Sequence, residues 1–336
     1  MTGGRLLVLT CLAAGGSGCA GMQSTLDPAG PAAGPIASLW WVLLGICVVV
    51  QLLVTAAVAV AIGRRHRQDV ASLLAHGEPT KRRVVMAATG VTLLVLVVLV
   101  SYSVVVDRAV ARLPPPDVVP LVVNVTGHMW WWEVEYEDDT SSRRFTTANE
   151  LRVPVGRPVV VNLEARDVIH SFWVPNLAGK LDVMPGRRNT LWFQADRPGT
   201  FRGQCAEFCG LQHAKMAFLV VAEAPDEFEA WAEAYRQTPA PPGTPLAARG
   251  EQVFLSSQCA LCHRVRGTQA WGLVAPDLSR IGSRRTLAAG TLPNTPENMA
   301  AWIRDPQGIK PGTFMPATRL DDDSLDALVA YLDGLR

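Results

Sequence analysis

Two long uncharged segments constrain the fold of this chain more than any other feature. Residues 36–62 and 84–106 each contain more than twenty consecutive residues with no charged side chain. A helix needs roughly 20 apolar residues to cross the hydrocarbon core of a bilayer, and the buried helices of soluble domains rarely run so long without charge. The two segments predict a transmembrane helical hairpin over residues 36–106.

The charge between the two segments predicts their orientation. Six basic side chains lie there: Arg64, Arg65, Arg67, Lys81, Arg82 and Arg83. Basic loops favour the cytoplasmic side of a membrane, so both outer ends of the hairpin are expected on the other side. The net charge of the whole chain is only +1, which provides no general attraction for nucleic acid.

Residues 1–19 have the pattern of an export signal. Arg5 is followed by a short apolar stretch and then by small residues up to Cys19, and this stretch is too short to span a bilayer. Cys19 is also placed like the lipid-attachment cysteine of bacterial lipoproteins. Lipidation at Cys19 and plain cleavage of the signal both remain open.

After the hairpin the pattern changes to short β-type runs. Three prolines at 114–116 end the helical pattern, and apolar runs separated by Pro, Gly, Asn and Asp follow up to residue 223. Such runs are typical of a small antiparallel β domain. A helix is predicted over 225–236, where three aromatic side chains at helical spacing favour packing. We assign residues 113–237 to this outer domain.

A proline-rich stretch separates the β domain from a helical one. Residues 238–245 contain four prolines, which favours an extended, semi-rigid linker. Helical patterns follow around residues 247–257, 296–304 and 322–335. They predict a small all-α domain over residues 246–336.

Four of the seven cysteines form two close pairs, each with a histidine downstream. In the first pair, Cys205 and Cys209 are followed by His213 and Met216, so one loop could bring two thiolates, an imidazole and a thioether together. These soft ligands suit copper better than zinc. In an exported protein, a disulfide between Cys205 and Cys209 is the alternative.

The second pair belongs to the pentapeptide Cys259-Ala260-Leu261-Cys262-His263. In a C-x-x-C-H motif the two thiols attach haem covalently, and the histidine ligates its iron. A zinc-binding or redox C-x-x-C motif is the alternative. A methionine further along the chain is expected as the sixth iron ligand, because histidine and methionine together raise the haem potential.

The segment CAEFCGLQHAKM at 205–216 resembles the binuclear copper (CuA) signature of cytochrome c oxidase subunits II, and the run DVIHSFWVP around His170 resembles the segment that supplies a further ligand. The resemblance implies that Cys205 and Cys209 bridge two copper ions. It implies four further ligands: His170, His213, Met216 and the backbone carbonyl of Glu207. In this family the side chain at Glu207 also reaches a magnesium ion at the boundary with subunit I.

Two other segments extend the resemblance. The run GHMWWWEVEY at 127–136 resembles the aromatic patch of the family, whose first tryptophan, here Trp130, accepts electrons from cytochrome c. Trp130 is therefore expected to be an exposed aromatic side chain over a buried metal. The segment KPGTFMP at 310–316 resembles the axial-methionine loop of class I cytochromes c and indicates Met315. Met299 competes, but it lies in a helical pattern where methionine usually fills a core.

From about residue 36 to its end, the chain resembles cytochrome c oxidase subunit II with a fused cytochrome c domain. The resemblance implies a cupredoxin-like Greek-key β domain on a two-helix hairpin in a bacterial plasma membrane. Electrons would pass from cytochrome c or another donor to the fused haem, to the copper pair and then to subunit I, which reduces oxygen and pumps protons. Subunit III would be a further partner. Glu78 is the nearest candidate for a proton-channel residue, but its surroundings do not match the family pattern.

Two other classes of protein remain open. The copper-bearing small subunit of a nitric oxide reductase shares both cofactor types, and a membrane-tethered electron carrier or copper-delivery protein would also use soft ligands. A nitrous oxide reductase would need more histidines than the six present. Quinol oxidase subunits II lack copper ligands, whereas all six ligand positions are intact here.

Overall fold

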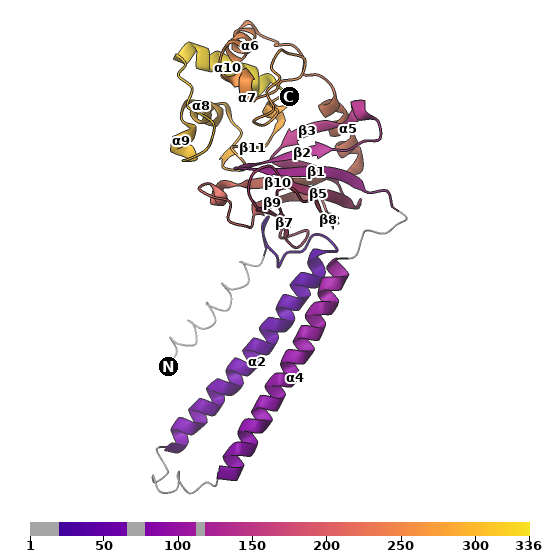
Figure 1. Cartoon of the computed structure of the whole chain (residues 1–336), viewed down its shortest axis with the longest axis vertical. Helices are drawn as coiled ribbons and strands as arrows, with labels where there is room; N and C mark the ends of the chain where they lie inside the picture. The colour runs from indigo at the N-terminus through magenta and orange to yellow at the C-terminus, as the bar shows by residue number, and fades with distance from the viewer. Residues whose placement is uncertain (1–19, 66–77, 112–117) are drawn as a thin grey trace, which may run out of the picture. The chain divides into compact units, whose positions relative to one another are not determined.

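The computed structural model describes residues 20–65, 78–111 and 118–336. The chain divides into two compact units, a hairpin at residues 34–112 and an outer unit made of residues 1–33 and 113–336 (Figure 1). The export signal, Cys19 and most of the loop between the long helices lie outside the described residues. The predictions made for those segments therefore stay predictions.

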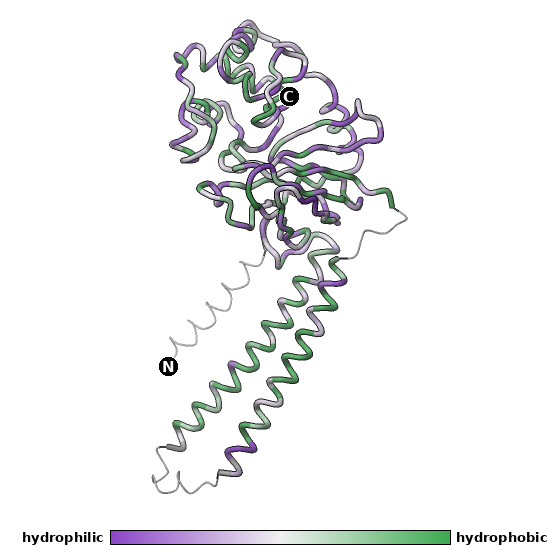
Figure 2. The backbone as a smooth tube through the Cα atoms, viewed as in Figure 1, coloured by the Kyte–Doolittle hydropathy of each residue, from purple (hydrophilic) through white to green (hydrophobic). Residues whose placement is uncertain are grey.

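The hairpin unit consists of two long helices, α2 (Ala33–Arg65) and α4 (Glu78–Val110). Each contains a stretch long and apolar enough to cross a membrane, with mean hydropathies of 2.7 and 2.6. Large apolar side chains such as Leu53 and Val84 are exposed, and Figure 2 shows hydrophobic residues along both helices. Both expected helices are present, and each extends beyond its uncharged run at both ends.

The outer unit contains a sandwich of two five-stranded sheets. The strand order is β3-β2-β1-β5-β8 in the first sheet and β4-β10-β9-β6-β7 in the second. The strands are β1 (Leu121–His128), β2 (Trp131–Tyr136), β3 (Phe145–Ala148), β4 (Glu150–Pro154), β5 (Val159–Ala165), β6 (His170–Trp173), β7 (Leu181–Val183), β8 (Asn189–Phe193), β9 (Gly199–Cys205) and β10 (Ala217–Glu223). The cupredoxin-like β-sandwich expected from the sequence is confirmed.

The expectation of a purely antiparallel domain is wrong in one respect. β1 pairs in parallel with β5, and β10 pairs in parallel with β4. Parallel neighbours cannot be joined by a tight hairpin and need a longer connection. Here other strands intervene in the chain between the two members of each parallel pair, so the local run-and-turn pattern of the sequence contained no sign of the pairing.

Aromatic side chains fill the interior of the sandwich. Trp132, Phe172 and Phe218 are fully buried, and their ring centroids lie between 4.6 and 5.8 Å apart. The helix α5 (Pro225–Arg236) adds Phe228 and Tyr235, both buried. The interpretation of its aromatic side chains as packing residues is confirmed.

The helical domain follows an irregular stretch at residues 237–244. Its helices are α6 (Pro245–Ser256), α7 (Cys259–Cys262), α8 (Pro296–Arg304), α9 (Pro306–Ile309) and α10 (Asp322–Gly334). A ladder of two short strands, β11 (Thr286–Leu287) and β12 (Leu292–Pro293), and an isolated bridge between Arg264 and Trp271 depart from the all-α expectation within residues 246–336. One apolar cluster that includes Phe254, Leu325 and Leu328 forms its core.

Helices α6 and α10 approach so closely at Gly250 that a side chain has no room there. A Cβ on Gly250 would lie 1.9 Å from the carbonyl oxygen of Ala327. We expect Gly250→Val to destabilise the helical domain by about 3 kcal/mol or more, because no rotamer relieves a clash with backbone. Gly243→Val is the control, since a Cβ there meets no atom within 4 Å. Thermal unfolding followed by near-ultraviolet circular dichroism measures the difference; equal midpoints would contradict the packing.

Cationic side chains of the helical domain donate to backbone carbonyls of the β domain. Arg266 and Arg280 donate to four carbonyls at the end of α5, those of Ala234, Tyr235, Arg236 and Gln237. The last carbonyls of a helix have no partner within the helix, and its dipole places negative charge there. The two guanidinium groups therefore cap α5 and hold the two domains together.

Candidate metal centre

The expected copper ligands lie on two paired strands and on the loop that follows one of them. His170 is the first residue of β6, and Cys205 is the last residue of β9. The two strands pair, with Phe172 opposite Cys205. Residues 206–216 then form a compact loop before β10 begins, with a 3-10 turn at η2 (His213–Lys215). We call residues 205–216 the copper loop.

The ligand atoms converge on the two cysteine sulfurs. Cys205 Sγ lies 3.7 Å from Cys209 Sγ and 3.9 Å from His170 Nδ1. Cys209 Sγ lies 3.7 Å from His213 Nδ1 and 3.8 Å from Met216 Sδ. Both cysteines are free thiols, so the disulfide alternative does not hold. Metal bonds to sulfur and nitrogen of about 2.0–2.3 Å, as at zinc, fit between atoms at these separations.

The two thiols are electrostatically coupled. The hydrogen bond with Cys209 lowers the pKa of Cys205 to about 3, while the same contact raises the pKa of Cys209 far above its ordinary value. Two interacting groups of this kind share their protons as a pair, and here the pair favours a single proton. A soft cation that binds both sulfurs displaces that proton, because thiolate is the form that binds metal.

Asp167 orients His170, one of the expected copper ligands. Its Oδ1 lies 2.8 Å from His170 Nε2, and the carboxylate accepts from the backbone N–H groups of Met129 and Val168, both at 2.7 Å. Burial lowers the pKa of His170, but hydrogen bonds with Cys205 and Asp167 outweigh burial and raise it overall. A carboxylate on the far ring nitrogen fixes the orientation of a metal-binding histidine. The sequence did not predict this role of Asp167. The one feature of the sequence that points to it is the position of Asp167 three residues before His170.

Two backbone features complete the site. The carbonyl oxygen of Glu207 lies 3.3 Å from Cys205 Sγ, close to the position expected of a backbone ligand, and the Glu207 side chain is half-buried. Gly127 of β1 lies against His170, where an added Cβ would be 2.8 Å from ring atom Cδ2. Any side chain at Gly127 would therefore displace the imidazole ring of His170.

Trp130 is not the exposed side chain that the sequence suggested. It is 5% exposed, because Phe314 of the helical domain stacks on it with ring centroids 5.4 Å apart. Its indole Nε1 donates to the carbonyl of Cys209 at 2.8 Å. Trp130 therefore contacts the copper loop directly, but the chain's own second domain covers it. The next two tryptophans differ from it: Trp131 stacks on His128, and Trp132 is fully buried.

The C-x-x-C-H motif has a geometry that fits covalent haem. Cys259 and Cys262 begin and end the single turn of α7, so their free thiols lie on the same side of that turn. His263 Nδ1 lies 2.7 Å from the carbonyl oxygen of Pro276 and donates its proton there, which leaves Nε2 as the ligand nitrogen. Burial lowers the pKa of His263 and thereby favours the neutral ring that iron requires.

The two candidate methionines have different surroundings. Met299 lies within α8, is 2% exposed and belongs to the apolar core of the helical domain. Met315 lies in the loop between α9 and α10, partly buried against that core. The interpretation of Met299 as a core residue agrees with these contacts, and Met315 stays the predicted sixth iron ligand.

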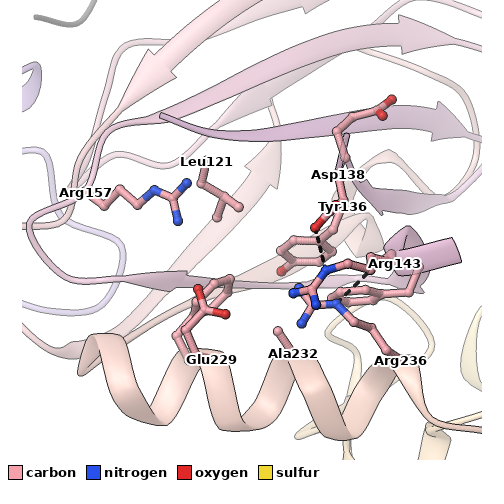
Figure 3. A pocket seen from close by; sticks show the side chains of 11 residues that line it. Leu121, Tyr136, Asp138, Arg143, Arg157, Glu229, Ala232 and Arg236 are labelled. Atoms are coloured by element: carbon pink, nitrogen blue, oxygen red, sulfur yellow. Dashed lines mark hydrogen bonds and ion pairs between the residues drawn. The ribbon is translucent and has the colours of Figure 1, made fainter. Parts of the chain in front are cut away.

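A cavity of about 130 Å³ lies next to α5, and arginine side chains line it in place of the soft ligands of the metal centre (Figure 3). Arg143, Arg157 and Arg236 surround it, but each already has partners. Arg143 pairs with Asp138 and Arg236 with Glu233, both at 3.1 Å, and Arg157 donates to two backbone carbonyls. Arg143 and Arg236 are thus engaged in ion pairs, and Arg157 is held by backbone carbonyls.

Comparison with known proteins gives matches over both outer domains. Residues 138–223 match the family described as "Cytochrome C oxidase subunit II, periplasmic domain". Residues 247–336 match the family described as "Cytochrome c". The two matches contain the expected ligand positions of the copper and haem sites in the respective domains.

Individual relatives extend the similarity to the whole chain. Cytochrome c oxidase subunit 2 of Alkalihalophilus pseudofirmus is 36% identical over 100% of this chain and 98% of its own length. The protein of the same name from Bacillus subtilis is 36% identical over 74% of this chain and 73% of its own length. Among solved structures, the periplasmic domain of subunit II of cytochrome oxidase of Bradyrhizobium japonicum is 33% identical, with a TM-score of 0.34, over 37% of this chain and 97% of that chain.

Proposed function

The chain belongs to the cytochrome c oxidase subunit 2 family, and we propose that it is the electron relay of its oxidase, from a donor protein through its own haem to a copper pair and then to subunit I. Membership makes it a subunit of an oxidoreductase complex and makes subunit I its partner. The family's periplasmic domain implies copper, and the cytochrome c domain implies haem c. The observation that carries the proposal is the convergence of two thiols, two imidazoles and a thioether in one buried site.

Each expected copper ligand has a proposed role. Cys205 and Cys209, whose sulfurs lie 3.7 Å apart, would hold both metal ions through their thiolates. The ring nitrogens of His170 and His213, one beside each sulfur, would be further ligands. Met216 and the Glu207 carbonyl would add weaker ones. A copper pair held in this way supplies one-electron transfer with little change in geometry, because both metals share the charge.

The haem domain has a matching set of roles. Cys259 and Cys262 would attach the haem through thioether links, and His263 Nε2 and Met315 would ligate its iron. The Pro276 carbonyl keeps the His263 ring oriented and neutral. Histidine and methionine together raise the potential of a cytochrome c haem. These two ligands would therefore bring the potential of the fused haem closer to that of the copper pair.

Further assignments follow from the family. We propose that oxygen is reduced to water and protons are pumped in subunit I, and that subunit III and cytochrome c are further partners. The Glu207 side chain is the proposed magnesium ligand at the subunit I boundary. The proposed location is the bacterial plasma membrane, with both outer domains on the periplasmic side. The proposed segments are the signal 1–19, the hairpin 36–106, the copper domain 113–237, the linker 238–245 and the haem domain 246–336.

A combined optical and electron-paramagnetic-resonance spectrum of the purified chain tests the proposal. We expect one unpaired electron shared by two copper nuclei, together with the bands of covalent haem c. Chelation of copper should remove the first signal and leave the second, because the two ligand sets lie in separate domains. A signal from single, reversibly bound copper ions would instead support a copper-delivery protein.

Turnover of the assembled complex distinguishes an oxygen-reducing oxidase from a nitric oxide reductase. Consumption of oxygen, and not of nitric oxide, is the expected activity. The relative that matches the whole chain is named as an oxidase subunit, which supports this choice over the small subunit of a nitric oxide reductase. Turnover of nitric oxide alone would contradict it.

A further inference from the structure

One loop of the haem domain lies directly over the copper loop. We call residues 309–315, which end at the proposed iron ligand Met315, the axial loop. Lys215 of the copper loop donates to the carbonyl of Ile309, and Gln212 donates to the carbonyl of Pro311. The Leu211 side chain lies against Gly312, where an added Cβ would be 2.7 Å from Leu211 Cδ1. The loops that carry the two proposed metal sites are therefore in direct contact.

Lys310 is buried within this contact. It is 3% exposed, and its Nζ donates to the carbonyls of Trp130 at 2.8 Å and Ala288 at 3.2 Å. Burial, reinforced by the charge of Lys215 and only partly opposed by Cys209, lowers the pKa of Lys310 to about 7. No ion pair involves Lys310 in the described part of the chain. Burial of an amine without a counter-ion costs free energy unless hydrogen bonds compensate for it. The two carbonyl acceptors supply that compensation and hold Lys310 in place.

The side chains next to Lys310 form a continuous path between the two sites. Phe314 precedes Met315 and stacks on Trp130 at an interplanar angle of 27°. Trp130 in turn donates to the carbonyl of Cys209. Phe314 is 69% exposed and Trp130 only 5%, so Phe314 lies between the indole and solvent. The path runs from the neighbour of the haem ligand to the backbone of a copper ligand.

We propose that Phe314 and Trp130 carry electrons from the chain's own haem to the copper pair, and that Lys310 is the positioning residue that holds these two rings in contact. In each step the haem loses one electron and the copper pair gains it, and no proton or bond changes place. The proposal rests on the proposed function, and it adds that Trp130 receives its electrons through Phe314, not by direct contact with a separate cytochrome c.

The test uses the full chain with both cofactors bound. A photoexcited dye of low potential donates one electron to the haem after a light pulse, and the rate at which that electron then appears on copper is measured. Lys310→Met should slow this rate about tenfold, because the buried carbonyl of Trp130 loses its donor, whereas that of Ala288 keeps Thr291. A loss of about 1.4 kcal/mol makes the conformation with the two rings in contact about tenfold less populated. Lys310→Arg keeps a donor and should restore most of the rate. Phe314→Leu, which removes the ring but leaves Lys310, should also slow it.

Two controls keep the result specific. Lys180→Met removes an exposed lysine of the β domain and should leave the rate unchanged. The potentials of both centres should stay the same in every variant, and hydrogen exchange in residues 309–315 should rise in Lys310→Met. Unchanged rates in Lys310→Met and Phe314→Leu would overturn the inference, as would slower rates explained by shifted potentials. A parent chain without a copper-pair spectrum would overturn the proposed function itself.

Discussion

Replacing Cys209 with serine should remove the copper-pair spectrum and sharply lower oxygen consumption by the oxidase. Loss of a group that only supports a metal ligand costs up to roughly 100-fold, and loss of the ligand itself should cost more. Cys209 Sγ lies within 3.8 Å of three other ligand atoms, those of Cys205, His213 and Met216. A hydroxyl is a harder ligand than a thiolate and suits copper poorly. The haem spectrum should be unchanged, because the haem ligands lie in another domain.

The matched control is Cys47→Ser. Cys47 is a free, exposed thiol in α2, so its replacement removes one sulfur from the chain without touching the copper loop. Optical spectra and metal content per chain, measured on both variants, give the comparison. A Cys209→Ser variant that retained two copper ions with the parent spectrum would show that Cys209 is not a bridging ligand.

Replacing Met315 with leucine should lower the haem potential by a substantial part of the roughly 0.8 V range that axial ligands span. Leucine has nearly the volume of methionine and usually replaces it at little structural cost, but it offers iron no sulfur. The haem absorption should change with the potential, while the copper spectrum stays intact. A redox titration followed by absorbance measures both.

Met299→Leu is the control for this second change. Met299 is a core residue of the same domain at 2% exposure, and the same substitution there should alter stability slightly and the potential hardly at all. If Met299→Leu shifted the potential and Met315→Leu did not, the assignment of the iron ligand would be reversed.

The membrane hairpin and the outer domains could be predicted because local patterns specify them. Uncharged runs longer than a bilayer core predicted α2 and α4, and prolines separated the two outer domains. The bounds of α8 agree with the expected 296–304, because Thr295 accepts from the N–H of Asn298 as a cap and Pro296 starts the helix. The parallel pairs β1–β5 and β4–β10 depend on long connections, for which the sequence contains no local signal.

The residues of the two proposed metal sites were selected for a different reason. The spacing of Cys205, Cys209, His213 and Met216 within one loop suggested soft-metal chemistry, whereas His170 came from resemblance, since 35 residues separate it from Cys205. Asp167 was missed because a carboxylate near a histidine is common in any sequence. Only the short distance between Asp167 and His170 in the folded chain distinguishes Asp167 from other carboxylates that lie near a histidine in the sequence.

The covering of Trp130 could not be predicted from the sequence. Lys310 reaches the Trp130 carbonyl across 180 residues of chain, and no periodicity or motif connects them. The aromatic patch was recognisable, but its exposure depended on where the second domain packs. That packing depends on single contacts between domains, such as the stacking of Phe314 on Trp130.

The acceptors at the contact between the two outer domains have an evolutionary consequence. Ala234, Tyr235, Arg236, Gln237 and Trp130 all accept through backbone oxygens, and every amino acid supplies the same carbonyl. The bonds to Ala234, Arg236 and Gln237 therefore do not depend on which side chains stand at those positions, whereas they do depend on the donors Arg266 and Arg280. Tyr235 and Trp130 are different, because their side chains are buried and have contacts of their own. Among relatives that share this contact, we expect the exposed acceptor positions Ala234 and Gln237 to vary more than Arg266 and Arg280.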